Sequence, residues 1–313
     1  MKLNLQTTAF IFPGQGSQTI GMGKDLAAQY PIAKQTFEEA DSILGFSLSK
    51  LMMEGAADEL NDTVNTQPAL FIHSIASYRA FSHLYPNLTP ASLAGHSLGE
   101  LSALAIAGAF SFEDGLRLVR KRAELMKRAG QLASGGMAAI LNLDIPALEK
   151  VCAEASTLDE SVQVANDNCP GQVVISGSKP AVERAMAGAK SAGAKRALPL
   201  AVSIAAHSNL MNSIQQEWNE AVAAANFSAL QIPVIGNVHA LPLTDESAAR
   251  ADIIAQMQSR VRWTESVQYL VSAGINTFVE VGNGTVLGGL VKRIADGVTI
   301  PPLGNPQDFA ALE

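Results

Sequence analysis

The pentapeptide Gly-His-Ser-Leu-Gly at residues 95–99 is the feature that most constrains how this chain can fold. The stretch 91–97 predicts a short strand that stops at Ser97, and the apolar stretch 98–110 predicts a buried helix. Glycines on both sides of the serine let a strand turn sharply into a helix and lift the serine above the sheet. We therefore expect an α/β fold with a parallel sheet and an exposed Ser97 hydroxyl.

Residues 131–206 have a different pattern from the rest of the chain. Strand-like and helical stretches follow one another in the order β-α-β-β-α-β, which is typical of a ferredoxin-like unit. Strands are predicted at 137–143, 162–166, 171–177 and 194–203, and helices at 145–155 and 179–193. We predict a small inserted ferredoxin-like α+β domain at 131–206, within a large α/β-hydrolase-like domain formed by 1–130 and 207–313.

The flanking regions supply the elements of the large domain. Within residues 7–18, a short buried strand ends in a glycine-rich loop. Further strands are predicted at 232–238 and 277–282, and helices at 113–129, 210–225, 248–258, 264–273 and 286–295.

Composition excludes several classes of function. The formal net charge is −7, whereas binding to nucleic acid phosphates needs a broad basic surface, so no nucleic acid partner is expected. No apolar run approaches the roughly 18 residues of a membrane span, and the N-terminus lacks the pattern of a secretory signal. Cys152 and Cys169 have no metal-ligand spacing, so we expect free thiols, no metal site and a cytoplasmic location.

Ser97 needs a base and oxyanion donors before it can act as a nucleophile. Leu98 begins the following helix, so its backbone N–H is the expected first donor. Of the five histidines, His207 is favoured because it lies where the chain leaves the small domain, beside the expected cleft.

The other histidines have simpler interpretations. His96 is adjacent to the serine on a sharp turn, where neighbouring side chains point apart, so an orienting role is expected. His73 lies in an apolar helical stretch, so we expect it in the core. His83 lies at a polar helix end, so we expect it at the surface. His239 follows a predicted strand and remains an alternative base.

Eight separated motifs occur together and in order along nearly the whole chain. They are "FPGQGSQTIGMG" (12–23), "TQPAL" (66–70), "GHSLGE" (95–100), "RLVRKRAELM" (117–126), "GQVVISG" (171–177), "KRALPL" (195–200), "VRWTESV" (261–267) and "EVGNGTVLGGLVKRI" (280–294). This set closely resembles the malonyl-CoA:acyl-carrier-protein transacylases of bacterial fatty acid synthesis and the related acyltransferase domains of polyketide synthases. The resemblance implies a two-domain fold, malonyl transfer, malonyl-CoA and holo acyl carrier protein as partners, and no cofactor.

The resemblance also implies catalytic roles. Ser97 carries the malonyl group, and His207 is the general base of a dyad that has no aspartate. The backbone carbonyl of Gln256 holds the second nitrogen of His207, so the side chain of Gln256 is expected to carry no information. The backbone N–H of Gln15 joins that of Leu98 as the second oxyanion donor.

In the same family an arginine binds the malonyl carboxylate, and the matching residue is Arg122 of "RAELM". A guanidinium suits a carboxylate because it donates two parallel hydrogen bonds. The resemblance adds weaker candidates for the pocket, which are His96, Gln67, Asn166 and Asn168.

Two positions depart from the family pattern, since alanine follows Arg122 where glycine is usual, and Ala206 precedes the histidine where relatives often carry phenylalanine or serine. Ala206 puts the selection of malonyl over methyl-branched groups in doubt. Acyl carrier proteins are acidic, so we expect a basic docking patch. The candidates are Arg117, Arg120, Lys121, Arg122, Lys127, Arg128, Lys190, Lys195, Arg196, Lys292 and Arg293.

The sequence patterns leave four alternative functions to consider. A serine esterase or thioesterase would share the pentapeptide but would not need Arg122. A dinucleotide-binding protein would have Gly-x-Gly-x-x-Gly, which neither "GQGSQTIG" nor "GNGTVLGG" provides. A stand-alone acyltransferase of a polyketide synthase and the malonyl-transfer subunit of malonate decarboxylase remain alternatives within the family.

Overall fold

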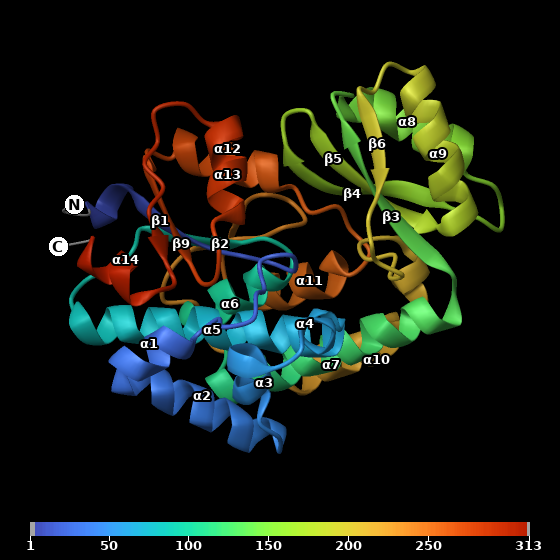
Figure 1. The fold of residues 1–313 in the computed structure, drawn as a ribbon. Coiled ribbons are helices and arrows are strands. Elements are labelled where there is room, and N and C mark those ends of the chain that lie inside the picture. Colours follow the sequence, from blue (N-terminus) through green and yellow to red (C-terminus); the bar gives the residue numbers. More distant parts are fainter. Residues whose placement is uncertain (1–3, 312–313) are drawn as a thin grey trace.

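A computed structural model describes residues 4–311 of the chain. Its larger sheet has six strands. Five of them run parallel to one another, and the sixth, β8, pairs antiparallel with β7 at one edge. The strand order is β10 (Pro302–Leu303), β9 (Thr277–Val281), β1 (Thr8–Phe12), β2 (Ser92–Gly95), β7 (Val234–Ile235) and β8 (Pro242–Leu243). The expected α/β fold with a parallel sheet is confirmed (Figure 1).

Helices cover both faces of this sheet, so its central strand is buried throughout (Figure 1). Because successive side chains of a strand point to opposite faces, β1 contributes to two separate apolar cores. Phe10 and Phe12 pack in the core that includes residues of α5 (Thr63–Leu84) and α7 (Phe112–Leu132). Ala9 and Ile11 pack in the core that includes residues of α12 (Trp263–Ser272) and α13 (Val286–Ile294).

The remaining helices of the large part lie around these two layers. The sequence patterns predict no elements for residues 24–61, where the structure has four helices of 6, 14, 7 and 5 residues. The four helices of that segment are α1 (Lys24–Gln29), α2 (Pro31–Leu44), α3 (Leu48–Glu54) and α4 (Ala57–Asn61). The other helices are α6 (Leu98–Ile106), α10 (Asn212–Ala224), α11 (Glu246–Gln256) and α14 (Pro306–Ala310), and 3-10 turns lie at Leu5–Thr7 and Asn209–Met211. No helix within 4–311 is long and apolar enough to cross a membrane.

A second, antiparallel sheet lies beside the first and is covered on one side by two helices (Figure 1). The chain order is β3 (Gly135–Leu141), α8 (Ile145–Ala155), β4 (Val162–Cys169), β5 (Gln172–Ser178), α9 (Lys179–Ser191) and β6 (Arg196–Pro199). In the sheet the order is β4-β5-β3-β6, so β5 separates the two strands that α8 connects. This is the split βαβ arrangement expected from the sequence pattern.

Several element boundaries differ from the predicted ones. The helix predicted at 98–110 ends at Ile106, because Gly108 adopts a left-handed φ of 83°. The strand predicted at 194–203 is only Arg196–Pro199, and the strand predicted at 232–238 is only Val234–Ile235. Helix α7 continues to Leu132, past the boundary expected at 130. The expected large domain also includes residues 1–3 and 312–313, which lie outside the described part.

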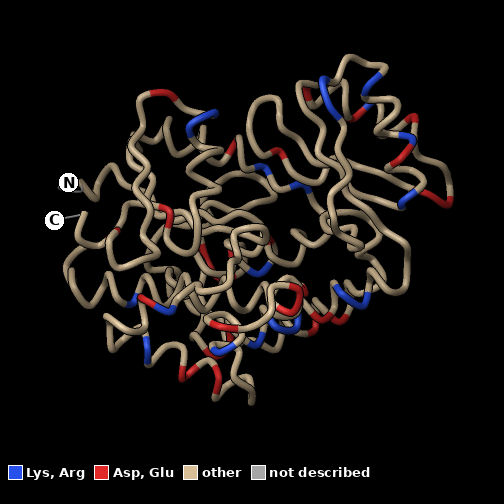
Figure 2. The backbone as a smooth tube through the Cα atoms, in the orientation of Figure 1, with Lys and Arg blue, Asp and Glu red and all other residues tan. Residues whose placement is uncertain are grey.

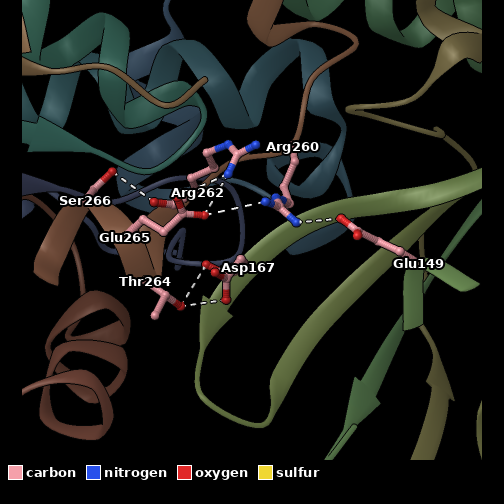
Figure 3. A network of polar contacts seen from close by, with 7 residues as sticks. All are labelled: Glu149, Asp167, Arg260, Arg262, Thr264, Glu265 and Ser266. Carbon is pink, nitrogen blue, oxygen red and sulfur yellow. Dashed lines mark hydrogen bonds and ion pairs between the residues drawn. The ribbon is translucent and has the colours of Figure 1, made fainter. Parts of the chain in front are cut away.

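A polar network links the small sheet to α12 and to the segment before it. Strand β4 exchanges backbone hydrogen bonds with the segment before α12, from Asp167 N to Val261 O (2.9 Å) and from Val261 N to Ala165 O (2.8 Å). Around this contact, Arg260 lies between Glu149 of α8 (3.0 Å) and Glu265 of α12 (3.5 Å) (Figure 3). The network holds the segment that follows α11 against the small sheet, and α11 ends at Gln256, a candidate site residue.

Candidate active site

Ser97 occupies a strained turn between β2 and α6. Its φ is 52° and its ψ is −105°, a conformation that non-glycine residues seldom adopt. A Cβ on Gly95 would lie 2.0 Å from the backbone of Gly99, and a Cβ on Gly99 would lie 2.0 Å from the carbonyl oxygen of Phe12. The two glycines are therefore required by close backbone approach, and both flank the serine of the pentapeptide.

Asn237, just beyond β7, holds this turn from the neighbouring strand. Its Oδ1 accepts a hydrogen bond from Ser97 N (2.8 Å), and its Nδ2 donates to Gly95 O (2.7 Å). Its own backbone N–H donates to Asp252 of α11 (3.0 Å). Asn237 was not among the predicted site residues, although a polar residue at the carboxyl end of a parallel strand is a usable signal.

Ser97, His207 and Gln256 form one hydrogen-bonded chain. The distance from Ser97 Oγ to His207 Nε2 is 2.8 Å, and that from His207 Nδ1 to Gln256 O is 2.8 Å. A carbonyl can only accept, so Nδ1 carries the proton and Nε2 is free to accept the serine proton. His207 itself has a left-handed φ of 58°, so its placement depends on tertiary contacts.

The environment of His207 keeps the ring neutral. Burial, and secondly the positive charge of Arg122, lower its pKa to about 3, while the hydrogen bond to the Gln256 carbonyl opposes this shift. A neutral imidazole with a free Nε2 lone pair is the form that a general base requires.

Arg122 places a buried cation beside the hydroxyl of Ser97. Its side chain is 2% exposed, and burial lowers its pKa to about 10, so it stays charged at neutral pH. Nη1 donates to Gln67 Oε1 (2.7 Å), and Nη2 donates to Ser97 Oγ (3.1 Å) and to Gln256 Oε1 (2.9 Å). All three partners are neutral, and Nε is buried without a partner within residues 4–311. A buried cation of this kind favours an anionic ligand.

A cavity of about 230 Å³ lies in front of these groups. Of the ten candidate site residues, all but Gln256 line it, including Gln15 and Leu98, whose backbone N–H groups were the expected oxyanion donors. The rest of the lining is apolar and was not predicted, apart from Ala206. It consists of Met126, Met137, Val174, Leu200, Val202, Ile204 and Ala206.

The weaker candidates have defined contacts in this cavity. His96 Nε2 lies 2.8 Å from Asn168 Oδ1, and its ring packs edge-on against Trp263. Asn166 lies in β4 where that strand bridges to Val261, and Gln67 holds Arg122. Of the remaining histidines, His73 is fully buried, and His83 and His239 are exposed. Among the described residues no group of three or more acidic, cysteine or histidine side chains could hold a metal ion.

Two expectations need correction. The side chain of Gln256 was expected to carry no information, but its Nε2 donates to Ser97 O (2.9 Å) and to Glu100 Oε2 (2.5 Å) while its Oε1 accepts from Arg122. The basic run of α7 is not a free patch, because Arg122 is buried and each of its other bases forms an ion pair with an acid. Figure 2 shows basic and acidic positions interspersed along the backbone in this part of the fold. The pairs are Arg117–Glu113, Arg120–Glu124, Lys121–Glu217, Lys127–Asp62 and Arg128–Glu217.

Comparisons with known proteins place the chain in a family. Residues 9–296 match the acyl transferase domain family. The chain is 46% identical over 303 residues, 97% of each protein, to the malonyl CoA-acyl carrier protein transacylase of Escherichia coli O157:H7.

Solved structures are similar over almost the full chain. The acyl carrier protein S-malonyltransferase of Vibrio cholerae superposes with a TM-score of 0.95 at 44% identity, over 98% of this chain and all of that one. A malonyl-transacylase in complex with a type II polyketide acyl carrier protein superposes with a TM-score of 0.93 at 40% identity, over 97% and 98% of the two chains.

Proposed function

The chain belongs to the acyl transferase domain family, and on that premise we propose that it transfers a malonyl group from malonyl-CoA to an acyl carrier protein in fatty acid biosynthesis. The acceptor is the phosphopantetheine thiol of the carrier protein. The observation that carries the proposal is the contact between a buried, charged arginine and the nucleophile of a serine–histidine pair, from Arg122 Nη2 to Ser97 Oγ at 3.1 Å. When a malonyl group is bound to Ser97 Oγ, the guanidinium of Arg122 is close enough to hold its free carboxylate.

The first half-reaction loads the enzyme. His207 Nε2 takes the proton of Ser97 Oγ as the oxygen attacks the thioester carbonyl carbon of malonyl-CoA. The backbone N–H groups of Gln15 and Leu98 stabilise the tetrahedral oxyanion. The carbon–sulfur bond then breaks, the sulfur of coenzyme A receives the proton from His207, and a malonyl ester remains on Ser97.

The second half-reaction uses the same groups in reverse. His207 takes the proton of the phosphopantetheine thiol, the sulfur attacks the ester carbonyl, and the proton returns to Ser97 Oγ as it leaves. Throughout, Arg122 donates two parallel hydrogen bonds to the distal carboxylate and holds the acyl chain in one orientation. Fixing the ester in this way limits attack by incidental water, which would release malonate instead.

The protein groups named above supply all the chemistry of this scheme, so we propose that no resident cofactor takes part. We also propose a cytoplasmic location, where malonyl-CoA is available. The division into a large domain (1–130 and 207–313) and a small inserted domain (131–206) is a further proposal, and the cavity lies between the two sheets that these ranges contain.

An intact-mass experiment tests the function. The protein is incubated with malonyl-, methylmalonyl- or acetyl-CoA, and holo acyl carrier protein is then added. We expect a malonyl adduct that is absent in Ser97→Ala and that moves to the carrier protein. Steady release of free malonate that the carrier protein does not change would refute transfer and favour a thioesterase.

A polyketide carrier protein is the second candidate acceptor, because one structural relative is bound to such a protein. Parallel assays with fatty acid and polyketide carrier proteins separate the two, since the physiological acceptor is expected to have the higher kcat/KM.

A further inference from the structure

The side chain of Gln256 connects three parts of the site, although only its backbone was expected to matter. Its amide oxygen accepts from Arg122 Nη2 (2.9 Å), and its amide nitrogen donates to Ser97 O (2.9 Å) and Glu100 Oε2 (2.5 Å). Its backbone oxygen separately faces His207 Nδ1. Gln256 is 1% exposed, so these partners are not exchanged with water.

The chemistry of the partners fixes the orientation of this amide. A guanidinium has donors and no acceptor, so it must face the amide oxygen of Gln256. The two groups on the other side, a backbone carbonyl and a carboxyl oxygen, accept the two N–H bonds of the amide nitrogen. A flipped amide would place N–H against N–H and oxygen against oxygen, which leaves buried groups unsatisfied. The arginine position is therefore specified by the amide.

Glu100, the last residue of "GHSLGE", holds the amide from behind. It is fully buried, and burial, followed by the neighbouring acid Asp252, raises the pKa of Glu100 well above its usual range. Glu100 Oε2 accepts from Gln256 Nε2, while Glu100 Oε1 is buried without a hydrogen-bond partner among the described residues. Asp252 in turn accepts from the backbone N–H groups of Asn237 (3.0 Å) and Val238 (3.3 Å). The amide of Gln256 is thus held by a buried carboxyl group next to a second, hydrogen-bonded acid.

We propose that the side chain of Gln256, held by Glu100, is a positioning residue that aims the guanidinium of Arg122 at the free carboxylate of the acyl group and so determines selectivity for carboxylated acyl donors. A neutral amide can fix the arginine without neutralising it, whereas a carboxylate at this place would occupy the cation as a direct ion pair. The guanidinium therefore keeps its charge available for the substrate. This inference rests on the proposed malonyl transfer.

The test exploits the fact that substitution of Gln256 keeps the backbone carbonyl that faces His207. Gln256→Met removes the amide at similar length. Gln258→Met is the matched control, because it lies two residues away and its side chain donates to Gln215 of α10. The measurement is the rate of acyl-enzyme formation at varied malonyl-CoA and acetyl-CoA, which separates kcat from KM for each donor.

We expect Gln256→Met to lower kcat/KM for malonyl-CoA about tenfold to a hundredfold, the effect of one or two lost hydrogen bonds to a charged group, mainly through KM. Acetyl-CoA loading should change by less than about threefold, because acetyl has no carboxylate for Arg122 to hold. Gln258→Met should resemble the wild type with both donors. An equal loss with both donors would show a merely structural role and overturn the proposal.

Two variants of Glu100 test the second part. Glu100→Gln keeps an oxygen acceptor for the amide nitrogen of Gln256, so it should retain the malonyl preference. Glu100→Met removes the acceptor and should reproduce the selective loss of Gln256→Met. Equal behaviour of the two variants would remove Glu100 from the role. A wild-type enzyme that forms no malonyl adduct would refute the proposed function itself, which is a different outcome from any of these.

Discussion

Replacing Arg122 by methionine should convert a malonyl-selective site into one that accepts acetyl groups. Methionine fills much of the same volume without charge, which suits a position that is only 2% exposed. The change removes the hydrogen bonds to Gln67, Ser97 and Gln256, but it leaves the bond between Ser97 Oγ and His207 Nε2 in place. The serine–histidine pair should therefore still react with a thioester.

The size of the effect follows from the hydrogen bonds that the arginine exchanges. Two charge-assisted bonds to a carboxylate contribute about 3 to 6 kcal/mol, and the bonds to Gln67 and Ser97 that are given up offset about 1 to 2 kcal/mol. The net loss of about 2 to 4 kcal/mol corresponds to a fall of about 30- to 700-fold in kcat/KM for malonyl-CoA. Acetyl-CoA should load at an equal or higher rate.

The assay is single-turnover formation of the acyl-enzyme, followed by intact mass, with each donor across a range of concentrations. Circular dichroism of Arg122→Met controls for folding, because the variant leaves Gln67 Oε1 and Gln256 Oε1 buried without a donor. An unchanged ratio of malonyl to acetyl loading in a folded variant would refute the assignment of Arg122 to the carboxylate.

Three further predictions concern pH, packing and salt. Because the folded pKa of His207 is about 3, below the ordinary 6.5, the rate of malonyl loading should not decrease as pH falls through 6.5, and a decrease there would contradict the assignment. The same lowered pKa should make the free energy of unfolding fall as pH drops from about 6.5 toward 3, which denaturation curves measure. Gly99→Ala should abolish loading or folding, since its Cβ would lie 2.0 Å from Phe12 O, whereas Gly289→Ala, with open space around it, should melt like the wild type. Turnover on carrier protein should fall as ionic strength rises, and a flat salt response in the wild type would exclude electrostatic docking. Lys195 and Arg196 are exposed bases without an ion pair in the described chain, so the double variant Lys195→Gln, Arg196→Gln should flatten the salt dependence. Arg117→Gln should flatten it less, because the charge of Arg117 is already paired.

Local patterns predicted most of the fold. Apolar alternation and helical periodicity identified the strands and helices of the ferredoxin-like sheet in their correct order, because such patterns depend on residues close in the chain. They failed where tertiary contacts decide the length of an element. Strand β7 has only two residues because its pairing with β2 and β8 is short, and the helices between 24 and 61 were not recognised.

The candidate site divides in the same way. Ser97 and Leu98 could be identified from the residues alone, since a strand, two glycines and a helix define the turn locally. His207 was only favoured by its position, and the roles of Gln15, Arg122 and the Gln256 carbonyl came from the resemblance to the family. In the structure each of these residues lies at or beside one cavity.

The sequence by itself therefore determined the order of elements in the small sheet, the candidate nucleophile Ser97 and the family, because each depends on short or ordered stretches of residues. Only the tertiary structure decided that the cation of α7 is buried against the serine while its neighbouring bases are paired, and that the amide of Gln256 joins Arg122 to Glu100. Gln256 lies 134 residues from Arg122 and 156 from Glu100 in the chain. No local pattern encodes such a contact, because it exists only once separate elements have packed and excluded water.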